Sequence, residues 1–285
     1  MSKKKIYREN KTIWAIVIAG ILVLACALIL FNRDETYDSM LIDEVGAETT
    51  KILLIGNSFL FTGRVGDQMI DIAKCTKPTR TFSVRQIAFP NYTLSDHFKR
   101  KTATSAIGQK PWNYVVIQDH SSSPFKRPKL LRQYVKIFDE EIDEINAETI
   151  LFETWSDKDR QESYKEVEET YRHLAKETKN RLAPVGYAIH LSLSRLPDIE
   201  LFSFDNHHLN DTGAYLVAAT LYATIFEEQV LLVPEKMALS GVKIDRKVKE
   251  SLNSIALEAI RLTDHSKHPE PEDSHSHSPR SMKKP

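Results

Sequence analysis

Short apolar runs alternate with longer amphipathic segments over most of this chain, and that alternation restricts the fold more than any other feature. The buried strands of a parallel sheet have the first pattern, and the helices that connect such strands have the second. The runs expected to form strands are 52–55, 82–87, 114–117, 149–152 and the stretch around 182–185. The segments with helical spacing are 129–145, 163–178 and 212–226. The sequence therefore predicts an α/β fold, with a central parallel sheet and helices that pack against it.

A second feature is the uncharged segment 12–31, "TIWAIVIAGILVLACALILF". A run of about 20 apolar residues is long enough to cross a bilayer core about 30 Å thick. Lysines and an arginine precede the run and acidic residues follow it, so the positive-inside rule predicts a single-pass transmembrane anchor. The basic N-terminus, 1–11, is then expected in the cytoplasm, and the rest of the chain outside it.

A cleaved signal peptide and a lipoprotein signal are alternatives to this anchor. Ala25, Cys26 and Ala27 form a small-residue cleavage site, and "VLAC" resembles a lipobox. The apolar run continues to Phe31, where a processed segment would turn polar, and this favours the uncleaved anchor. All three interpretations export the remainder of the protein.

The rest of the chain divides by composition into a polar linker, 32–50, a globular domain, 51–262, and a C-terminal tail, 263–285. The tail is rich in Pro, Ser, Glu, Lys and His and has almost no apolar residues, so it is expected to be disordered.

Charge and composition exclude several classes of partner. The 39 basic and 39 acidic residues cancel, and the globular part has no basic stripe interleaved with aromatic residues, so we expect no nucleic-acid partner. Cys26 and Cys75 are too few for a disulfide framework. The sequence shows no metal-binding motif, and its glycines lack the spacing of phosphate or dinucleotide loops. No metal or cofactor is predicted.

The stretch "KILLIGNSFLFTG" leads from the first apolar run directly to Gly56, Asn57 and Ser58. A hydroxyl at the carboxyl end of a parallel strand, on a turn that opens a helix, lies where α/β folds place reactive groups. The simpler interpretation is that Ser58 only caps the following helix. The stretch by itself leaves both interpretations open.

A partner for such a hydroxyl occurs in "FSFDNHHLNDTGAYL", where Asp205 lies three residues before His208 and just ahead of the helix expected at 212–226. A serine nucleophile needs a base, a group that orients the base, and donors for the developing oxyanion. Ser58, His208 and Asp205 therefore form a candidate catalytic triad, with His207 as the competing base.

These blocks resemble the SGNH or GDSL-like serine hydrolases, many of which are esterases and lipases. "IGNSF" matches the nucleophile block, and 205–208 match the D-x-x-H block before a final helix. Further stretches, "NYTLSDHF", "WNYVVIQDHSSSP", "ETW" and "LAPVGYAI", are similar in the same order to a bacterial, membrane-anchored branch of that family. The resemblance covers 51–226 and implies a flavodoxin-like, three-layer α/β/α sandwich around a parallel sheet.

The resemblance also implies roles for single residues. Ser58 would be the nucleophile, His208 the base and Asp205 its orienting partner. The N–H groups of Ser58 and Asn91 and the amide of Gln118 would form the oxyanion hole. Asn91 stands where the family has Gly, but Asn tolerates left-handed backbone angles, and Gln118 stands where the family has Asn. Asn57, where Asp is commoner, with His120, Trp155 and His207, are the candidate pocket residues.

The expected function is a membrane-tethered, extracytoplasmic ester hydrolase that removes O-acetyl or other small acyl groups from carbohydrates without a cofactor. One alternative is a non-catalytic module that binds a glycan or a protein, which the changes at Asn91 and Gln118 favour. Another is an acyltransferase, which differs in the nucleophile that resolves the acyl-enzyme. A Ser58–His208 distance below about 3.2 Å would favour catalysis over the binding module.

Overall fold

The structure is a computed structural model that describes residues 49–79, 81–230 and 233–263. The predicted anchor, 12–31, lies outside the described residues, as do nearly all of the linker and the predicted disordered tail except Thr263, which is helical. Within the described ranges, no helix combines the length and the apolar character that a bilayer span requires.

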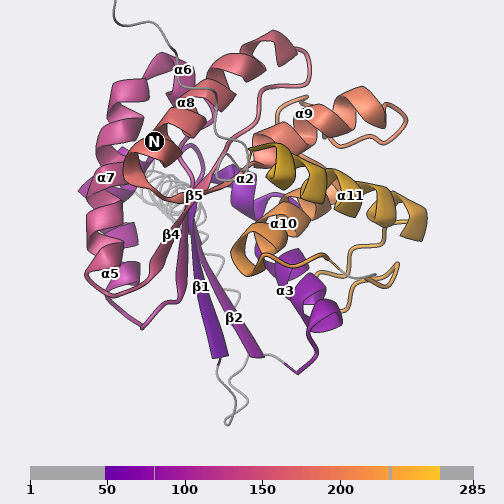
Figure 1. Cartoon of the computed structure of the whole chain (residues 1–285), viewed down its shortest axis with the longest axis horizontal. Coiled ribbons are helices and arrows are strands. Elements are labelled where there is room, and N and C mark those ends of the chain that lie inside the picture. Colours follow the sequence, from indigo (N-terminus) through magenta and orange to yellow (C-terminus); the bar gives the residue numbers. More distant parts are fainter. Residues whose placement is uncertain (1–48, 80, 231–232, 264–285) are drawn as a thin grey trace, which may run out of the picture.

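A five-stranded parallel sheet forms the centre of the molecule, with the strand order β2-β1-β3-β4-β5 (Figure 1). This is the order of flavodoxin-like folds. The strands are β1 Thr49–Gly56, β2 Thr81–Ala88, β3 Tyr114–Ile117, β4 Glu148–Phe152 and β5 Arg181–Ala183. Each expected strand is present. β5 ends earlier than the expected stretch because Pro184 follows it and Val185 already begins a helix.

Helices connect the strands and cover both faces of the sheet. The three helices expected from the sequence are present as α7 Pro128–Asp143, α8 Tyr164–Thr178 and α10 Asp211–Phe226. The further helices are α2 Ser58–Phe61, α3 Val65–Thr76, α4 Leu94–Lys99, α5 Thr102–Ile107, α6 Ser123–Lys126, α9 Val185–Arg195 and α11 Arg246–Thr263, with a short 3-10 turn at Gln161–Ser163.

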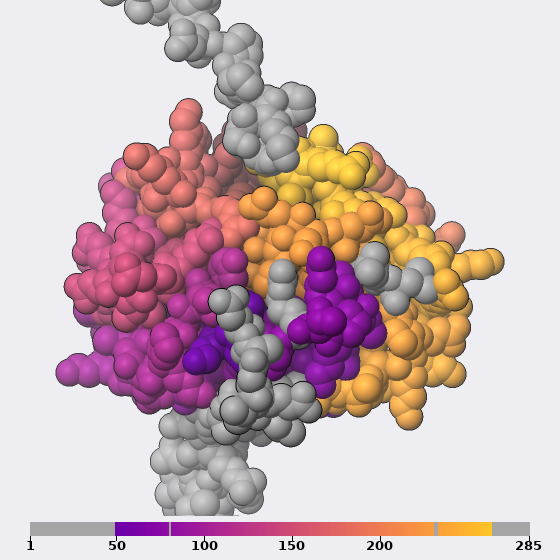
Figure 2. Space-filling model, turned by 60° about the horizontal axis from the view of Figure 1, so that its bottom comes forward, coloured from indigo at the N-terminus to yellow at the C-terminus, as the bar shows by residue number. Residues whose placement is uncertain are grey.

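Side chains that alternate along β1 divide the core into two layers. Ile52 and Leu54 pack into the cluster that contains α3, α9, α10 and α11, whereas Leu53 and Ile55 pack into the cluster that contains α5, α7 and α8. The period of two along a strand requires this division when both faces of a sheet are covered. Figure 2 shows the magenta and pink helices on one side, and α10 and α11, in orange and yellow, together with the purple α3 on the other. The fold is therefore a three-layer α/β/α sandwich.

Helix α10 is buried almost all round, because it lies between the sheet and α11. Its residues from Gly213 to Ile225 are all buried, as expected for a helix without a polar face. The hydroxyl of Tyr215 donates to Asn253 Oδ1 at 2.9 Å and joins α10 to α11. The amphipathic α11 thus forms an outer cover that shields α10 from solvent.

Helix α9 begins so close to β4 that its second residue must be glycine. A Cβ on Gly186 would lie 2.2 Å from the backbone carbonyl oxygen of Thr154. We expect Gly186→Ala to lower the free energy of unfolding by about 1 to 3 kcal/mol, since backbone must move to admit the methyl group. Gly108→Ala is the matched control, because the nearest atom to its added Cβ lies 3.7 Å away. Urea unfolding of both variants measures the difference, and equal midpoints would contradict the packing argument.

Candidate active site

Ser58 is the first residue of α2, directly after the turn that ends β1. The residue that caps α2 is Asn57, whose Oδ1 accepts a hydrogen bond from the N–H of Phe59 at 3.1 Å. Asn57 has the extended backbone that a capping residue adopts. The interpretation of Ser58 as only a helix cap is therefore wrong, and its hydroxyl is available for another contact.

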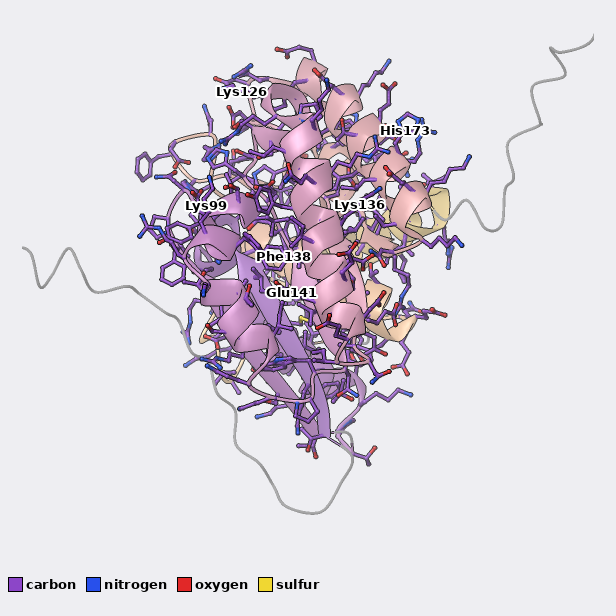
Figure 3. The ribbon with its side chains drawn as sticks, turned by 90° about the vertical axis from the view of Figure 1, so that its left-hand side faces the viewer. Lys99, Lys126, Lys136, Phe138, Glu141 and His173 are labelled. Atoms are coloured by element: carbon purple, nitrogen blue, oxygen red, sulfur yellow. The ribbon has the colours of Figure 1, made fainter. Side chains whose placement is uncertain are left out.

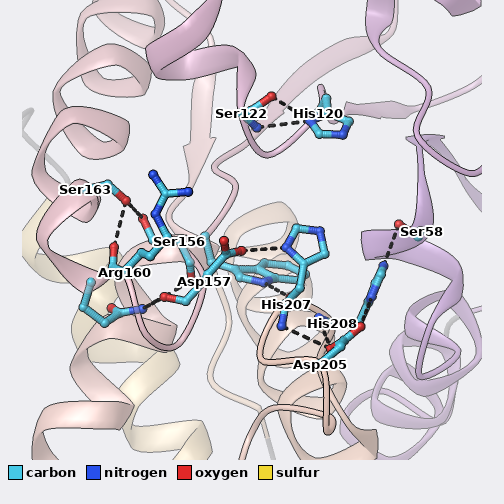
Figure 4. A network of polar contacts seen from close by, with 12 residues as sticks. Ser58, His120, Ser122, Ser156, Asp157, Arg160, Ser163, Asp205, His207 and His208 are labelled. Atoms are coloured by element: carbon cyan, nitrogen blue, oxygen red, sulfur yellow. Dashed lines mark hydrogen bonds and ion pairs between the residues drawn. The ribbon is translucent and has the colours of Figure 1, made fainter.

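That contact is with His208, which reaches Ser58 from the loop before α10 (Figure 4). His208 Nε2 lies 2.9 Å from Ser58 Oγ, and His208 Nδ1 lies 2.6 Å from Asp205 Oδ2. The structure thus brings the hydroxyl, the imidazole and the carboxylate of the candidate triad into one chain of hydrogen bonds. These distances fit proton transfer from the hydroxyl to the ring without a rearrangement.

Asp205 is held by the loop as well as by the histidine. Its Oδ1 accepts the backbone N–H groups of His207 at 3.1 Å and His208 at 2.9 Å. Burial raises the pKa of Asp205, but the hydrogen bonds from the His208 ring and from these two N–H groups outweigh it and hold the pKa at about 2. The carboxylate is therefore ionised at neutral pH and favours the His208 tautomer with its proton on Nδ1.

His207 points away from the serine hydroxyl, toward the loop after β4. Its Nδ1 lies 2.6 Å from Asp157 Oδ1, and its backbone oxygen accepts a hydrogen bond from Trp155 Nε1 at 2.9 Å. Trp155 stacks on Phe59 with ring centroids 3.6 Å apart. The geometry therefore places His208, and not His207, at Ser58.

Two residues of this arrangement, Phe59 and Asp157, were missed by the sequence analysis. Both lie at the carboxyl edge of the sheet, Phe59 in α2 after β1 and Asp157 in the loop after β4. The available signal was the polar stretch "SDKDR" after the fourth apolar run, since side chains at that edge gather around one site.

Asn91 lies in the loop after β2 and has the left-handed backbone that the sequence analysis allowed for, with φ at 61°. Asn is among the residues that adopt this conformation most readily. Among the described residues, neither the N–H of Asn91 nor that of Ser58 donates a hydrogen bond within the protein. Both donors remain available for a ligand atom.

The side-chain amide of Gln118 was expected to serve the oxyanion hole, but it is used in hydrogen bonds within the protein. The side chain is fully buried, its Oε1 accepts the N–H of Asn57 at 2.8 Å, and its Nε2 donates to Asn57 Oδ1 at 3.1 Å and to the backbone oxygen of Asp119. The longer side chain thus reaches past the site and joins the ends of β1 and β3. Gly56 permits this approach, because a Cβ there would lie 2.1 Å from Gln118 Oε1.

Asn57 also joins the turn between β1 and α2 to the loop after β2, since its Nδ2 donates a hydrogen bond to the backbone oxygen of Tyr92 at 2.9 Å. Nearby, buried Asp119 accepts the N–H groups of Leu94 at 3.1 Å and His120 at 2.7 Å. Burial raises the pKa of Asp119 to about 6 despite these bonds. The ends of β1, β2 and β3 are therefore held together by side-chain amides and one carboxyl.

A cavity of about 190 Å³ opens beside this site, between the loops after β3 and β4. His120 lies on its wall, where Nδ1 accepts the N–H of Ser122 at 3.1 Å, so a neutral His120 carries its proton on Nε2. The lining residues are His120, Ser121, Ser122, Phe125, Lys126, Trp155, Ser156, Asp157, Arg160, Ser163 and His207. Of the predicted pocket residues, His120, Trp155 and His207 thus line the cavity, whereas Asn57 is buried in the turn beneath.

A larger hollow of about 530 Å³ lies at the opposite edge of the sheet, where the strands begin. Thr50, Tyr114 and Arg181 line it, and Arg181 is paired there with Glu148 and Glu227. Its lining contains no histidine, cysteine or serine. The smaller cavity at the carboxyl edge is therefore the one nearer the candidate triad, to which His207 on its wall connects it.

Glu153, the residue after β4, is a fully buried carboxyl next to Tyr164 and Tyr187. Burial, and then the negative charge of Glu168, raise its pKa from 4.5 to about 8, and the hydroxyl of Tyr164 and the N–H of Tyr187 oppose this only in part. Neither carboxyl oxygen has a well-formed hydrogen bond within the described residues. Glu153 is therefore protonated at neutral pH.

No protein-family model matches the chain, and no curated protein matches it in sequence. Solved structures do resemble it. A DUF4886 family protein from Bacteroides uniformis is 16% identical, with a TM-score of 0.59, over 76% of this chain and 96% of that one. Axe2, an acetylxylan esterase from Geobacillus stearothermophilus, is 17% identical, with a TM-score of 0.53, over 66% of this chain and 99% of that one.

A lipase/acylhydrolase from Enterococcus faecalis is 18% identical, with a TM-score of 0.52, over 62% of this chain and 95% of that one. SGNH hydrolases and GDSL-like esterases are thus among the structural neighbours, and the expectation of their α/β fold is confirmed. At these identities the likeness is one of fold.

Removal of the Asn57 side chain tests its part in the turn. We expect Asn57→Ala to lower the free energy of unfolding by about 2 to 3 kcal/mol, because α2 loses its cap and the buried amide of Gln118 loses a partner. Ser58→Ala is the control and is expected to change stability by less than about 0.5 kcal/mol, since Ser58 does not cap the helix. Chemical unfolding measures both, and a larger effect of Ser58→Ala would contradict the assignment of the cap.

The raised pKa of Glu153 predicts a pH-dependent stability. Between its unfolded value near 4.5 and its folded value of about 8, the folded state keeps a proton that the unfolded state has lost. Stability is therefore expected to fall as pH rises through this window, by up to about 1.4 kcal/mol per pH unit. Glu153→Gln should flatten this dependence, whereas Glu169→Gln, at an exposed position of α8, should retain it. Unfolding free energies between pH 5 and pH 8 check this, and parallel curves for wild type and Glu153→Gln would contradict it.

Proposed function

We propose that this protein is a serine ester hydrolase in which Ser58, His208 and Asp205 act as a catalytic triad. The observation that carries the proposal is the unbroken chain of hydrogen bonds, 2.9 Å from Ser58 Oγ to His208 Nε2 and 2.6 Å from His208 Nδ1 to Asp205 Oδ2. The chain lies at the carboxyl edge of a parallel sheet, where this fold class carries its sites.

In the proposed mechanism Ser58 Oγ attacks the carbonyl carbon of an ester, while His208 Nε2 accepts the hydroxyl proton. Asp205, with its pKa at about 2, remains a carboxylate and stabilises the imidazolium that forms. His208 then donates the proton to the alcohol that leaves. Water attacks the acyl-enzyme with His208 again as the base, which releases the acid and restores Ser58.

The N–H groups of Ser58 and Asn91 are the proposed donors to the carbonyl oxygen as it becomes negative. Such donors stabilise the transition state most when they are fixed in place before the reaction. Ser58 is fixed by the cap of α2, and Asn91 by the turn at the end of β2. Gln118 would act indirectly, because it holds the N–H and side chain of Asn57 next to the nucleophile.

We propose small acyl esters of carbohydrates as the substrate class. The fold is shared with acetylxylan esterases, and most residues that line the cavity next to His207 are polar, which suits a hydroxylated alcohol part. The uncharged segment 12–31 supports a membrane tether, which would place the reaction outside the cytoplasm.

One observation favours the alternative of a non-catalytic binding module on the same fold. The side-chain amide of Gln118 is used within the protein, so the oxyanion hole has backbone donors from Ser58 and Asn91 without it. Loss of one donor can cost about 3 kcal/mol of transition-state stabilisation. The two functions differ in whether Ser58 reacts.

Labelling of the full chain with a fluorophosphonate probe, together with hydrolysis of p-nitrophenyl acetate, tests this directly. We expect wild type to be labelled and active, Ser58→Ala to lose both properties, and His208→Ala to lose at least about a thousandfold in kcat/KM because the base is removed. His173→Ala, at an exposed position of α8 (Figure 3) that does not line the cavity, should match wild type. A folded wild type that neither reacts with the probe nor hydrolyses the ester would favour the binding module.

A further inference from the structure

Two cationic side chains line the cavity that His207 borders, and they have no acidic partner among the described residues. Lys126 ends α6, near the end of the molecule toward which the strands run (Figure 3), and Arg160 lies in the loop after β4 (Figure 4). Neither forms an ion pair or a side-chain hydrogen bond with any residue that the structure describes. Both side chains are exposed, and both border the same concave surface.

The charge of this cavity is positive overall. Asp157 is the only carboxylate among its lining residues, and that carboxylate is already bonded to His207. Burial lowers the pKa of His120, and the positive charges of Arg127, His207 and Lys126 lower it further. A neutral His120 presents Nε2–H as an additional donor. The cavity thus offers donors and positive charge with no acidic group left unpaired to oppose them.

The position of the cavity relative to the nucleophile decides which part of an ester would enter it. The His207 ring lies between the cavity and the triad, with its centroid 4.7 Å from that of His208 (Figure 4). His208 is also the group that returns a proton to the departing alcohol in the proposed mechanism. The alcohol part of the substrate therefore lies on the side of the histidines, next to the cavity.

We propose that this cavity is a subsite for an anionic group, a carboxylate or a phosphate, on the alcohol part of the ester, bound by Arg160 and Lys126. The guanidinium offers a planar pair of N–H donors that matches such an oxyanion, and the ammonium adds charge. This inference rests on the proposed ester hydrolysis and names its substrate class: acyl esters of acidic, rather than neutral, hydroxylated compounds.

The test compares esters that differ only in charge, with the full chain. The first pair is the O-acetyl ester of methyl glucuronoside, which has a carboxylate, and that of methyl glucoside, which has none. The second pair is the acetyl ester of glycerol phosphate and that of glycerol. We expect at least one anionic ester to have about tenfold higher kcat/KM than its neutral counterpart at low ionic strength, and the preference to shrink as NaCl screens the charges.

The double variant Lys126→Gln with Arg160→Gln should bring this ratio close to one. Both side chains are exposed, so the core is spared. Lys74→Gln, at an exposed position of α3 outside the cavity, should keep the ratio of wild type. Which of the two pairs shows the preference distinguishes a carboxylate from a phosphate subsite. Equal kcat/KM within both pairs, with hydrolysis intact, would overturn the inference and leave the proposed function standing.

A binding measurement separates the two proposals if no ester is hydrolysed. Methyl glucuronoside, glycerol phosphate, methyl glucoside and glycerol are titrated calorimetrically into Ser58→Ala, with and without the double substitution. Binding of an anionic compound alone, lost on the double substitution, would support the subsite even though the proposed hydrolysis had failed. Equal or absent binding of charged and neutral compounds would overturn the subsite.

Discussion

The reciprocal hydrogen bonds between Asn57 and Gln118 fix the turn that presents Ser58. Gln118 Oε1 accepts the N–H of Asn57, and Gln118 Nε2 donates to its side chain, so the ends of β1 and β3 are held in one relative position. Neither amide reaches solvent. A buried amide pair is stable only when both partners are satisfied, which makes the geometry of this turn specific. The position of Ser58, the cap of α2 and the contact with the loop after β2 all depend on this turn.

Much of the fold could be predicted from the sequence because its strands are fully buried on both faces. Parallel strands such as β1 appear as unbroken apolar runs, and the amphipathic helices α7 and α8 show their period clearly. The end of β5 was less well predicted, since a short edge strand followed by Pro184 carries little pattern. Local sequence also gives no sign of which distant helix covers α10.

The candidate site could be predicted in part, because some of its residues lie in short local segments. Ser58, Asp205 and His208 lie in short segments with recognisable spacing, and the structure brings their side chains together. The hydrogen bonds of Gln118 with Asn57 could not be inferred, because they depend on the distance between two strand ends and on the absence of a Cβ at Gly56. The pairing of His207 with Asp157 likewise joins two loops 50 residues apart. Such contacts are properties of the assembled sheet edge.

The division of roles between Asn57 and Ser58 has a consequence for how this scaffold can change. The helix start is secured by the residue before the hydroxyl, and the loop with Asp205 is secured by its own backbone N–H groups. The Ser58 side chain is therefore not required for the architecture that presents it. The hydroxyl could therefore be lost or replaced while the turn and the loop with Asp205 keep their shape, so a single substitution would separate the proposed hydrolysis from ligand binding on the same scaffold.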